Sequence, residues 1–346
     1  MRVPLDEPAW WYRDSASVMA RCMAPLAGLY GWCATARYAG ATPYRSRLPV
    51  LCAGNFTAGG TGKTPLVLHL CGHLRAGGRR PVVLTRGYGG RHAGPHWVGA
   101  SDTAGEVGDE ALLLARSAPT LVARDRRAGA RAIETGAAAA DVIVMDDGLQ
   151  NPQLAKDLTL AVVDGGRGLG NGRVMPAGPL RAPLEFQLEL ADAIVVNEAA
   201  AGAGAAVAER LRQRFDGPVL RCATVVAGDA AWLKGQRVVA WAGIGAPQRF
   251  FAMLRALGAE VVEAIPFRDH QRLGQADALR LLDLAGQHRA ALVSTGKDMA
   301  RIGRGTGALA DLAAATRVLP IELAFAEPDA ERLAALIDSA MEGRRG

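Results

Sequence analysis

The chain has 346 residues and a formal net charge of +6, and half of its residues are hydrophobic although only 5% are aromatic. This length exceeds what one hydrophobic core usually supports, so we expect two domains, and the composition excludes a disordered chain. The five cysteines form no C-x-x-C pair, which indicates reduced thiols of a cytoplasmic protein and argues against a cysteine zinc site. The net positive charge is compatible with binding to anionic lipid, nucleic acid or phosphorylated substrates, and it does not distinguish among them.

The amino terminus carries an uncharged stretch at residues 22–36, between Arg21 and Arg37. As a helix it would span about 22 Å, which is shorter than the roughly 30 Å hydrocarbon core of a bilayer. We therefore expect a helix that lies on a membrane surface, with the rings of residues 10–12 in the headgroup zone. The alternative is an apolar helix packed on its own domain.

Short apolar runs alternate with helical stretches along the rest of the chain. The first set of expected strands covers residues 48–54, 81–87, 119–125, 141–147, 158–164 and 191–197, with helices at 63–77, 107–117, 126–138 and 203–215. The second set has strands at 238–244, 260–267 and 291–298 and helices at 246–257 and 275–288. Buried strands separated by helices predict an α/β fold with a mostly parallel sheet flanked by helices.

A phosphate-binding loop is indicated by AGNFTAGGTGKTPLVLHL, residues 53–70, where a glycine-rich turn joins a strand to a helix. Backbone N–H groups at such a helix start cradle phosphate oxygens. The residues expected to bind ATP are Gly59, Gly60, Thr61, Gly62, Lys63 and Thr64. Thr57 stands where the usual motif has its first glycine.

A metal-binding carboxylate is indicated by DVIVMDDGLQ, residues 141–150, because Asp146 and Asp147 end an expected strand at the edge where the phosphates would lie. We expect Mg²⁺ to bind Asp146 together with the Thr64 hydroxyl. The alternative is that the carboxylate pair caps the following turn. With the phosphate loop, this motif predicts a P-loop NTPase-like core.

Three further motifs are weaker evidence for a functional site when each is taken alone. Asp109 and Glu110 open an expected helix, where acidic residues also offset the helix dipole. His270 follows an aspartate in PFRDHQRLG, residues 266–274, as many loop histidines do. STGKD, residues 294–298, could bind phosphate or cap a helix.

Taken in order, GNFTAGGTGKTP, TRGYGG, VGDEALLLA, DDGLQ, GRVMPAGPLRAP, FRDH and TGKD resemble the tetraacyldisaccharide 4′-kinases of lipid A biosynthesis. The resemblance implies transfer of the ATP γ-phosphate to the 4′-hydroxyl of tetraacyldisaccharide 1-phosphate, producing lipid IVA. It also implies a catalytic pair, in which His270 would hold and tune Asp109 and Asp109 would act as base toward the sugar hydroxyl. TGKD is looser than the family's acidic version, so the resemblance leaves the role of Lys297 undecided.

The resemblance suggests further polar contacts around ATP, Mg²⁺ and the sugar. Glu110, Asp147 and Gln150 would complete the shell around metal and phosphates, and Arg86, Tyr88, Arg126 and Arg181 would contact phosphate or sugar. Arginine's planar fork suits phosphate oxygens, although any of these arginines could be surface charge.

The expected organisation has three parts: a membrane-associating helical segment at residues 1–47, a P-loop kinase core at 48–222, and a smaller α/β domain at 223–346 that contributes to the active-site cleft. Because a tetraacylated substrate cannot leave the bilayer cheaply, we expect a peripheral enzyme on the cytoplasmic face of the inner membrane. We expect neither a nucleic-acid partner nor an obligate protein partner.

Two other functions stay open from the residues. A surface-partitioning ATPase has a similar double glycine, but its extra lysine is replaced here by Ala58. A guanine-nucleotide switch is suggested by TGKD, but Asp146-Asp147-Gly148 does not give the D-x-x-G spacing.

Overall fold

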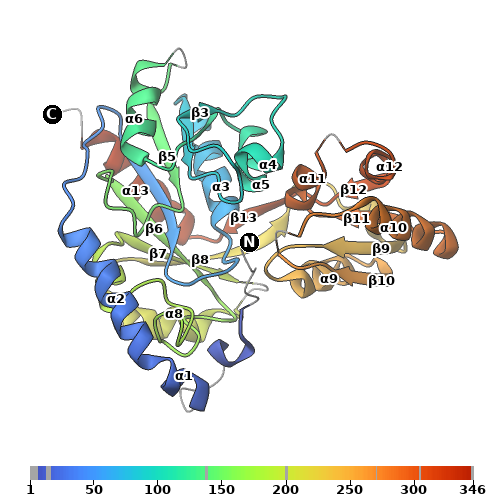
Figure 1. Ribbon diagram of the computed structural model, residues 1–346, viewed down its shortest axis with the longest axis horizontal. Helices are drawn as coiled ribbons and strands as arrows, with labels where there is room; N and C mark the ends of the chain where they lie inside the picture. Colours follow the sequence, from blue (N-terminus) through green and yellow to red (C-terminus); the bar gives the residue numbers. More distant parts are fainter. Residues whose placement is uncertain are drawn as a thin grey trace.

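The computed structural model describes residues 7–12, 17–136, 139–198, 202–269, 271–303 and 305–343. His270, one of the two expected catalytic residues, lies outside the described residues. The described chain forms a large lobe and a smaller lobe that lie side by side, each built on its own sheet (Figure 1).

The large lobe is built on a nine-stranded sheet in the order β13-β8-β7-β6-β1-β5-β2-β4-β3. In chain order the strands are β1 (Val50–Asn55), β2 (Pro81–Thr85), β3 (His96–Trp97), β4 (Thr120–Val122), β5 (Val142–Asp146), β6 (Leu158–Asp164), β7 (Ala193–Glu198), β8 (Val219–Val226) and β13 (Ile321–Phe325). Every pair from β8 to β4 is parallel, whereas β13 and β3 pair antiparallel at the two edges. The inner strands are buried on both faces, which explains why they read as continuous apolar runs.

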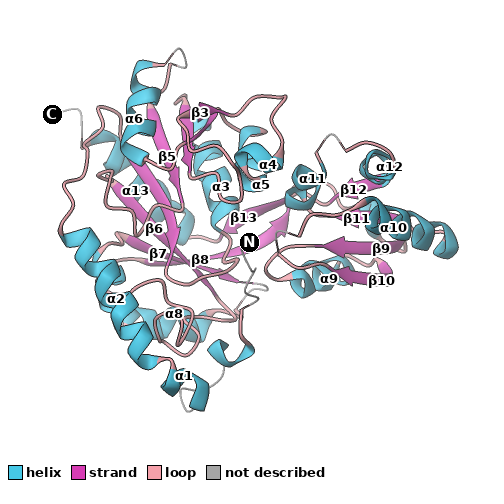
Figure 2. Ribbon diagram, in the orientation of Figure 1, coloured by secondary structure: helices cyan, strands magenta, loops and turns pink. Residues whose placement is uncertain are grey.

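Helices cover both faces of this sheet (Figure 2). On one face pack α3 (Lys63–Ala76), α5 (Asp109–Ala115) and α13 (Asp329–Glu342), and on the other α6 (Arg126–Thr135), α7 (Leu184–Glu189) and α8 (Ala205–Arg212). A single turn, α4 (Ala104–Val107), precedes α5 and is separated from it by Gly108. The interruption at Gly108 divides the helix expected at residues 107–117.

The smaller lobe has a four-stranded parallel sheet in the order β10-β9-β11-β12. Its elements are β9 (Arg237–Ala242), α9 (Pro247–Ala256), β10 (Glu260–Pro266), α10 (Gln275–His288), β11 (Ala291–Ser294), α11 (Gly296–Ile302), α12 (Ala308–Ala315) and β12 (Thr316–Val318). Helix α9 packs on one face of the sheet, and α10 and α12 pack on the other. The predicted α/β fold with a mostly parallel sheet and a second, smaller α/β unit is confirmed.

Two helices, α1 (Val18–Cys22) and α2 (Ala24–Ala39), run along the outer side of the large lobe (Figure 1). A short 3₁₀ turn, Ala9–Tyr12, precedes them. Small residues face the protein: Ala20 and Ala27 are buried, and Gly31 lies against Pro183. Large apolar residues face outward instead, namely Val18, Met19, Leu26, Leu29, Tyr30 and Trp32, whose exposed fractions range from 44% to 74%. Among the described residues, no helix has the length and apolarity needed to cross a membrane.

The rings of residues 10–12 were expected to point outward into the headgroup zone. In the structure, not all of them do. Trp11 is buried, and its indole N–H donates to the carbonyl of Pro176 at 3.0 Å. The Tyr12 hydroxyl donates to Glu7 at 2.7 Å. The apolar outer surface therefore belongs to α1 and α2 and not to the turn before them.

The end of the chain returns to the large lobe. Strand β13 pairs with β8, and α13 contributes Leu333, Ile337 and Met341 to the core beneath the large sheet. A division at residue 223 assigns these elements to the smaller domain, whereas their pairing and burial join them to the large lobe. Strand β8 also continues to Val226, four residues beyond the expected end of the core. The three-part organisation remains a proposal, which these contacts modify at residues 223–226 and 321–342.

Candidate active site

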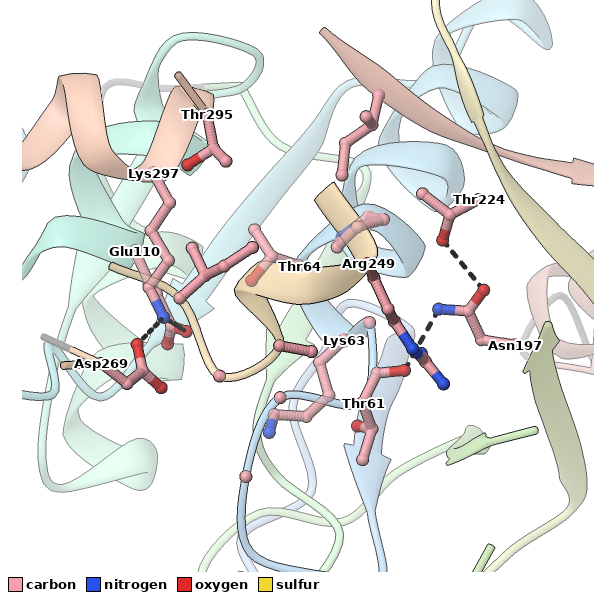
Figure 3. Close-up of a pocket in the computed structure, with 18 of the residues that line it drawn as sticks. Thr61, Lys63, Thr64, Glu110, Asn197, Thr224, Arg249, Asp269, Thr295 and Lys297 are labelled. Carbon is pink, nitrogen blue, oxygen red and sulfur yellow. Dashed lines mark hydrogen bonds and ion pairs between the residues drawn. The ribbon is translucent and has the colours of Figure 1, made fainter. Parts of the chain in front are cut away.

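Polar side chains gather at the carboxyl edge of the large sheet, where parallel strands place their ends together. Asn55 ends β1, Thr85 ends β2, Asp146 ends β5, Asp164 ends β6 and Asn197 lies near the end of β7. Thr85, Asp146 and Asn197 line a cavity of about 2510 Å³ that extends between the two lobes, and Asn55 and Asp164 contact residues that line it. Figure 3 shows the part of this cavity around the phosphate loop.

The phosphate loop occupies the position that its sequence predicts, between β1 and the first turn of α3. Gly59 and Gly62 have φ values of 97° and 99°, a left-handed backbone that suits glycine. The Asn55 amide donates to the carbonyl of Thr57 at 2.7 Å and to the Thr61 hydroxyl at 3.2 Å, so it ties the loop to the strand. Lys63 and Thr64 open α3 at the cavity wall.

Thr57, the departure from the usual motif, has a structural explanation. It forms a bridge with Leu180, and the next amide, that of Ala58, donates to the carbonyl of Pro179 at 2.8 Å. The guanidinium of Arg181 donates to the carbonyl of Thr57 at 3.1 Å. The start of the loop is thus extended and paired with the GPLRAP segment, a conformation that needs no glycine.

The two aspartates after β5 have opposite electrostatic environments. Asp146 pairs with Ala53 of β1, accepts a hydrogen bond from the Thr85 hydroxyl at 2.8 Å, and is buried. Burial and the nearby carboxylates of Glu110 and Asp147 raise the pKa of Asp146 to about 7, against the effects of Lys63 and Thr85. A buried carboxylate of this kind gains from a bound cation.

Asp147 instead contacts two cations. Its Oδ1 lies 2.6 Å from Arg181 and 3.6 Å from the Nζ of Lys63. Although burial acts to raise its pKa, the charges of Arg181 and Lys63 hold the pKa of Asp147 well below the ordinary range. Its φ is 51°, so the residue turns sharply out of β5 toward the loop.

Asp109 and Glu110, at the start of α5, are held by cations from α11 of the smaller lobe. Arg301 contacts Asp109 Oδ2 through two nitrogens, at 2.7 and 3.2 Å, and both side chains are about 95% buried (4% and 5% exposed). Lys297 lies 3.2 Å from Glu110 and 3.5 Å from Asp269 (Figure 3). Glu110 lines the cavity, whereas Asp109 lies behind the lining residues that the structure describes.

The other expected site residues divide into two groups. Arg86, Tyr88, Gln150 and Arg181 line the cavity, and Arg86 and Tyr88 are exposed. Arg126 does not: it is buried, and its guanidinium donates to the carbonyl of Asp146 at 3.1 Å and to that of Ala123. Its expected contact with substrate is replaced by a structural contact that supports the carboxyl end of β5.

The structure adds polar residues that no motif indicated. Asn197 donates to the carbonyl of Thr61 at 3.3 Å and accepts from the Thr224 hydroxyl at 2.9 Å (Figure 3). Arg249 of α9 lies 2.6 Å from Asp164 and also lines the cavity. A strand end at NE, residues 197–198, was the signal for Asn197, because polar side chains at the carboxyl edge of parallel strands face a ligand crevice. No local pattern distinguishes Arg249 or Arg301 in a chain with 40 basic residues.

The cavity wall also includes the amino-terminal helix. Tyr30, Cys33, Ala34 and Arg37 of α2 line it, and the Arg37 guanidinium donates to the backbone carbonyl of Gln150 at 3.4 Å. The Tyr38 ring packs edge-on against Phe186 of α7 at a centroid distance of 5.3 Å. One continuous wall thus runs from the phosphate loop to the apolar outer surface of α2.

Comparisons with known proteins agree with this geometry. A Tetraacyldisaccharide 4'-kinase of Methylorubrum extorquens (strain PA1) is 51% identical over 323 residues, covering 92% of this chain and 94% of the relative. That of Nitrobacter winogradskyi is 46% identical over 350 residues, covering 99% of each chain. The "apo" form of LpxK from Aquifex aeolicus in complex with ATP has the same fold, with a TM-score of 0.72 at 23% identity over 94% of this chain and 100% of that chain. Since the family model described as Tetraacyldisaccharide-1-P 4'-kinase also matches residues 19–342, the chain belongs to that family.

Proposed function

We propose that this protein transfers the γ-phosphate of ATP to the 4′-hydroxyl of tetraacyldisaccharide 1-phosphate in lipid A biosynthesis, giving lipid IVA. The observation that carries the proposal is the arrangement around one cavity: the phosphate loop, Asp146 at the end of β5 and Glu110 of α5 line it, and Asp109, next to Glu110 in α5, lies behind the lining. A phosphoryl transferase needs these parts for donor, metal and acceptor.

The donor half consists of the loop at residues 59–64. Its backbone N–H groups, at the start of the fourteen-residue helix α3, would bind the ATP phosphates. Lys63 would leave Asp147 to contact the terminal phosphates, since its present separation of 3.6 Å from Asp147 is that of a loose ion pair. Arg181 would keep Asp147 paired during that change.

Thr64 and Asp146 offer the oxygen ligands that Mg²⁺ prefers, so the residues present fit the ion. The fit rests on the buried Asp146 carboxylate, which is held in place by Thr85 and has a raised pKa. Mg²⁺ would neutralise charge that develops on the transferred phosphoryl group. Gln150, whose amide donates to the carbonyl of Asn55 at 2.8 Å, would support the same edge of the site.

For the acceptor half we propose Asp109 as the base toward the sugar hydroxyl, with His270 as its partner. In the described arrangement Arg301 holds the Asp109 carboxylate at the boundary between the lobes. A movement of α11 with its lobe would expose Asp109 to the sugar. Arg86 and Tyr88, exposed side chains of the cavity wall, would contact the sugar or its phosphate.

Asp109→Asn tests the base. We expect kcat to fall about 10²- to 10⁴-fold, the usual worth of a general base, with little change in ATP affinity. Asp298→Asn is the matched control, because it also removes a buried carboxylate from Arg301, at 2.9 Å, without removing the base. If Asp298→Asn lowered kcat as much as Asp109→Asn does, Asp109 would act only through its contact with Arg301 and not as a base.

We further propose that α1 and α2 lie on the cytoplasmic face of the inner membrane. Their large apolar side chains point away from the protein, and their small ones point toward it. A helix with this distribution gains free energy when its apolar face enters the interface of a bilayer, and Arg21 and Arg37 suit anionic headgroups. Acyl chains could then stay in the membrane while the sugar reaches the cavity along α2.

Exchanging Leu29 and Trp32 for glutamine tests this surface. These side chains are 59% and 67% exposed, so their replacement should leave folding unchanged and weaken binding to vesicles of anionic phospholipid about 10-fold or more. Leu279→Gln is the control, since Leu279 is 54% exposed on α10 in the smaller lobe. If the control and the double variant bound vesicles as the parent does, we would withdraw the membrane role of α2.

The two other functions that the residues left open are not favoured. The family match over residues 19–342 covers both lobes, including the smaller one that a partitioning ATPase or a guanine-nucleotide switch would not share. In TGKD, Thr295 caps α11, accepting from the amide of Asp298, and Lys297 pairs with two carboxylates. These contacts differ from those of a motif that reads a base.

A further inference from the structure

We propose that His92, His96 and Asp102 bind one divalent transition-metal ion of the Zn²⁺ class, on the loop that joins β2 to α5. Each residue offers one ligand atom, and these atoms all lie within 4.8 Å of one another. The site is separate from the candidate active site, because none of the three is among the described residues that line the large cavity.

The donor atoms already lie close to the spacing that a metal requires. His96 Nε2 is 2.9 Å from Asp102 Oδ2, and the rings of His92 and His96 stack with centroids 4.3 Å apart and an angle of 7°. Ligands of tetrahedral zinc lie roughly 3.3 Å apart, given metal–nitrogen distances of about 2.0–2.1 Å. Parallel rings cannot both aim a nitrogen lone pair at one ion, so one ring must tilt. Both rings are only half-buried, which leaves room for that movement.

The backbone presents the three residues from separate anchored points. His96 lies on β3 and pairs with Val122 of β4, and the amide of His92 donates to the carbonyl of Glu106 at 2.9 Å. Asp102 directly precedes the capping box of α4. Ligands that are fixed in this way before binding lose little conformational entropy when an ion arrives.

Hydrogen bonds orient the Asp102 carboxylate. Its side chain is 13% exposed, and its Oδ2 accepts the amide of Gly99 at 2.8 Å as well as contacting His96. These two contacts fix the orientation of the carboxylate. An orienting hydrogen bond on a ligating carboxylate is a usual feature of metal sites.

The donor set selects the class of ion. Two imidazoles and one carboxylate suit Zn²⁺, Co²⁺ or Ni²⁺, whereas Mg²⁺ prefers oxygen ligands alone. An excess of Mg²⁺, which the active site would take, should therefore not displace an ion bound here. This preference allows the two sites to be measured separately.

A bound ion would also stabilise the segment that carries the acidic pair. The ligands lie between Tyr88 and Gly108, whose backbones are in close contact: a side chain added at Gly108 would meet the carbonyl of Tyr88 at 2.5 Å. Linking His92 and His96 to Asp102 closes the loop between these two ends. We expect metal binding to raise the melting temperature.

The test is equilibrium dialysis of tag-free protein against Zn²⁺ in the presence of millimolar-excess Mg²⁺, with bound metal counted by elemental analysis. We expect one Zn²⁺ per chain and at least a 10-fold loss of affinity in His96→Ala and in Asp102→Asn. Co²⁺ in place of Zn²⁺ should give visible absorption bands that His92→Ala removes.

His288→Ala is the control, because His288 is also half-exposed and lies 3.7 Å from a carboxylate, that of Glu263. It should bind Zn²⁺ as the parent does. The proposal is overturned if the parent binds less than one Zn²⁺ at micromolar free metal. It is equally overturned if His96→Ala and Asp102→Asn, folded by circular dichroism, retain the parental affinity. None of these measurements depends on kinase activity.

Discussion

Arg301 is the residue at which the two lobes meet the proposed base. Its guanidinium contacts Asp109 of the large lobe and, within the smaller lobe, Asp298 at 2.9 Å and the carbonyl of Gly243 at 2.9 Å. Arginine's planar fork allows this bridging, whereas a lysine would supply a single point charge. For the base proposed above, Arg301 would therefore be a positioning residue that sets where the Asp109 carboxylate lies when the lobes approach each other.

Arg301→Lys should keep the charge and lose the two-nitrogen contact with Asp109. We expect kcat to fall about 10- to 100-fold, the order of loss that a misplacement of about 1 Å causes, while the KM for ATP changes little. Steady-state kinetics measures both values. Arg255→Lys, a substitution at an exposed arginine of α9, should change neither. A rise in the KM for ATP with kcat unchanged would contradict the positioning role.

The sequence predicts single residues well only where the backbone imposes a motif. Lys63, Thr64 and Asp146 were predictable because a strand–loop–helix junction needs glycine turns and a strand-end carboxylate. Arg126 was assigned to the substrate, although it supports β5 from the buried side, because a motif does not record which way a side chain points. Arg301 and Asn197 act through contacts with residues distant in sequence, and no local spacing encodes those.

At the scale of elements, the linker between α2 and β1 is attached to α6 by one buried carboxylate. Glu134 accepts from the Tyr44 hydroxyl at 2.8 Å and from the amide of Arg47 at 2.9 Å, and its side chain is 3% exposed. Burial acts to raise its pKa, but the hydrogen bonds from Ser46, Tyr44 and Arg47 lower the pKa of Glu134 below the ordinary 4.5.

Glu134→Gln should lower the free energy of unfolding near neutral pH by about 1 kcal/mol, because a neutral amide accepts these hydrogen bonds less strongly. A carboxyl group whose pKa is lower in the folded state stabilises the protein above pH 4.5, and that stability is lost as pH falls through the lower, folded value. Urea unfolding at several pH values should therefore show the parent and the variant converging in acid. A difference that grows in acid would contradict this assignment.

The elements that the sequence predicts best are the inner strands. β1, β5, β6 and β7 are buried along their whole length and so read as apolar runs. β13 was missed because it is an edge strand, where three of its five residues are exposed. Its partner, β8, was also missed, and the core was expected to end within it at Cys222, for a related reason: the second half of β8 is only partly buried.

At the scale of the whole molecule, Lys297 connects the lobes through charge. It lies between Glu110 of the large lobe and Asp269 of the smaller one. Burial acts to lower its pKa, but the carboxylates of Glu110, Asp269 and Asp109 raise the pKa of Lys297 above its ordinary value. Without this cation, the carboxylates would face one another across the cavity.

Lys297→Met should therefore separate the lobes and slow phosphate transfer. We expect a larger radius of gyration in small-angle X-ray scattering and a fall in kcat/KM for the lipid acceptor. Lys234→Met, which removes an exposed lysine of the smaller lobe, should leave both values at those of the parent. If Lys297→Met also kept the parental radius of gyration and kcat/KM, the contacts of Lys297 with Glu110 and Asp269 would not hold the lobes together.

If the outward apolar face of α1 and α2 holds the protein on a membrane, as proposed above, the rate of this enzyme has to be expressed differently. An enzyme fixed to a bilayer meets its acceptor by diffusion in two dimensions, so the relevant concentration is the mole fraction of acceptor among the surrounding lipids. Added inert phospholipid would then slow the reaction although the bulk acceptor concentration stays constant. Because Tyr30 and Arg37 of α2 also line the cavity, the surface that would hold the enzyme and the path that would supply its acceptor would then be one helix.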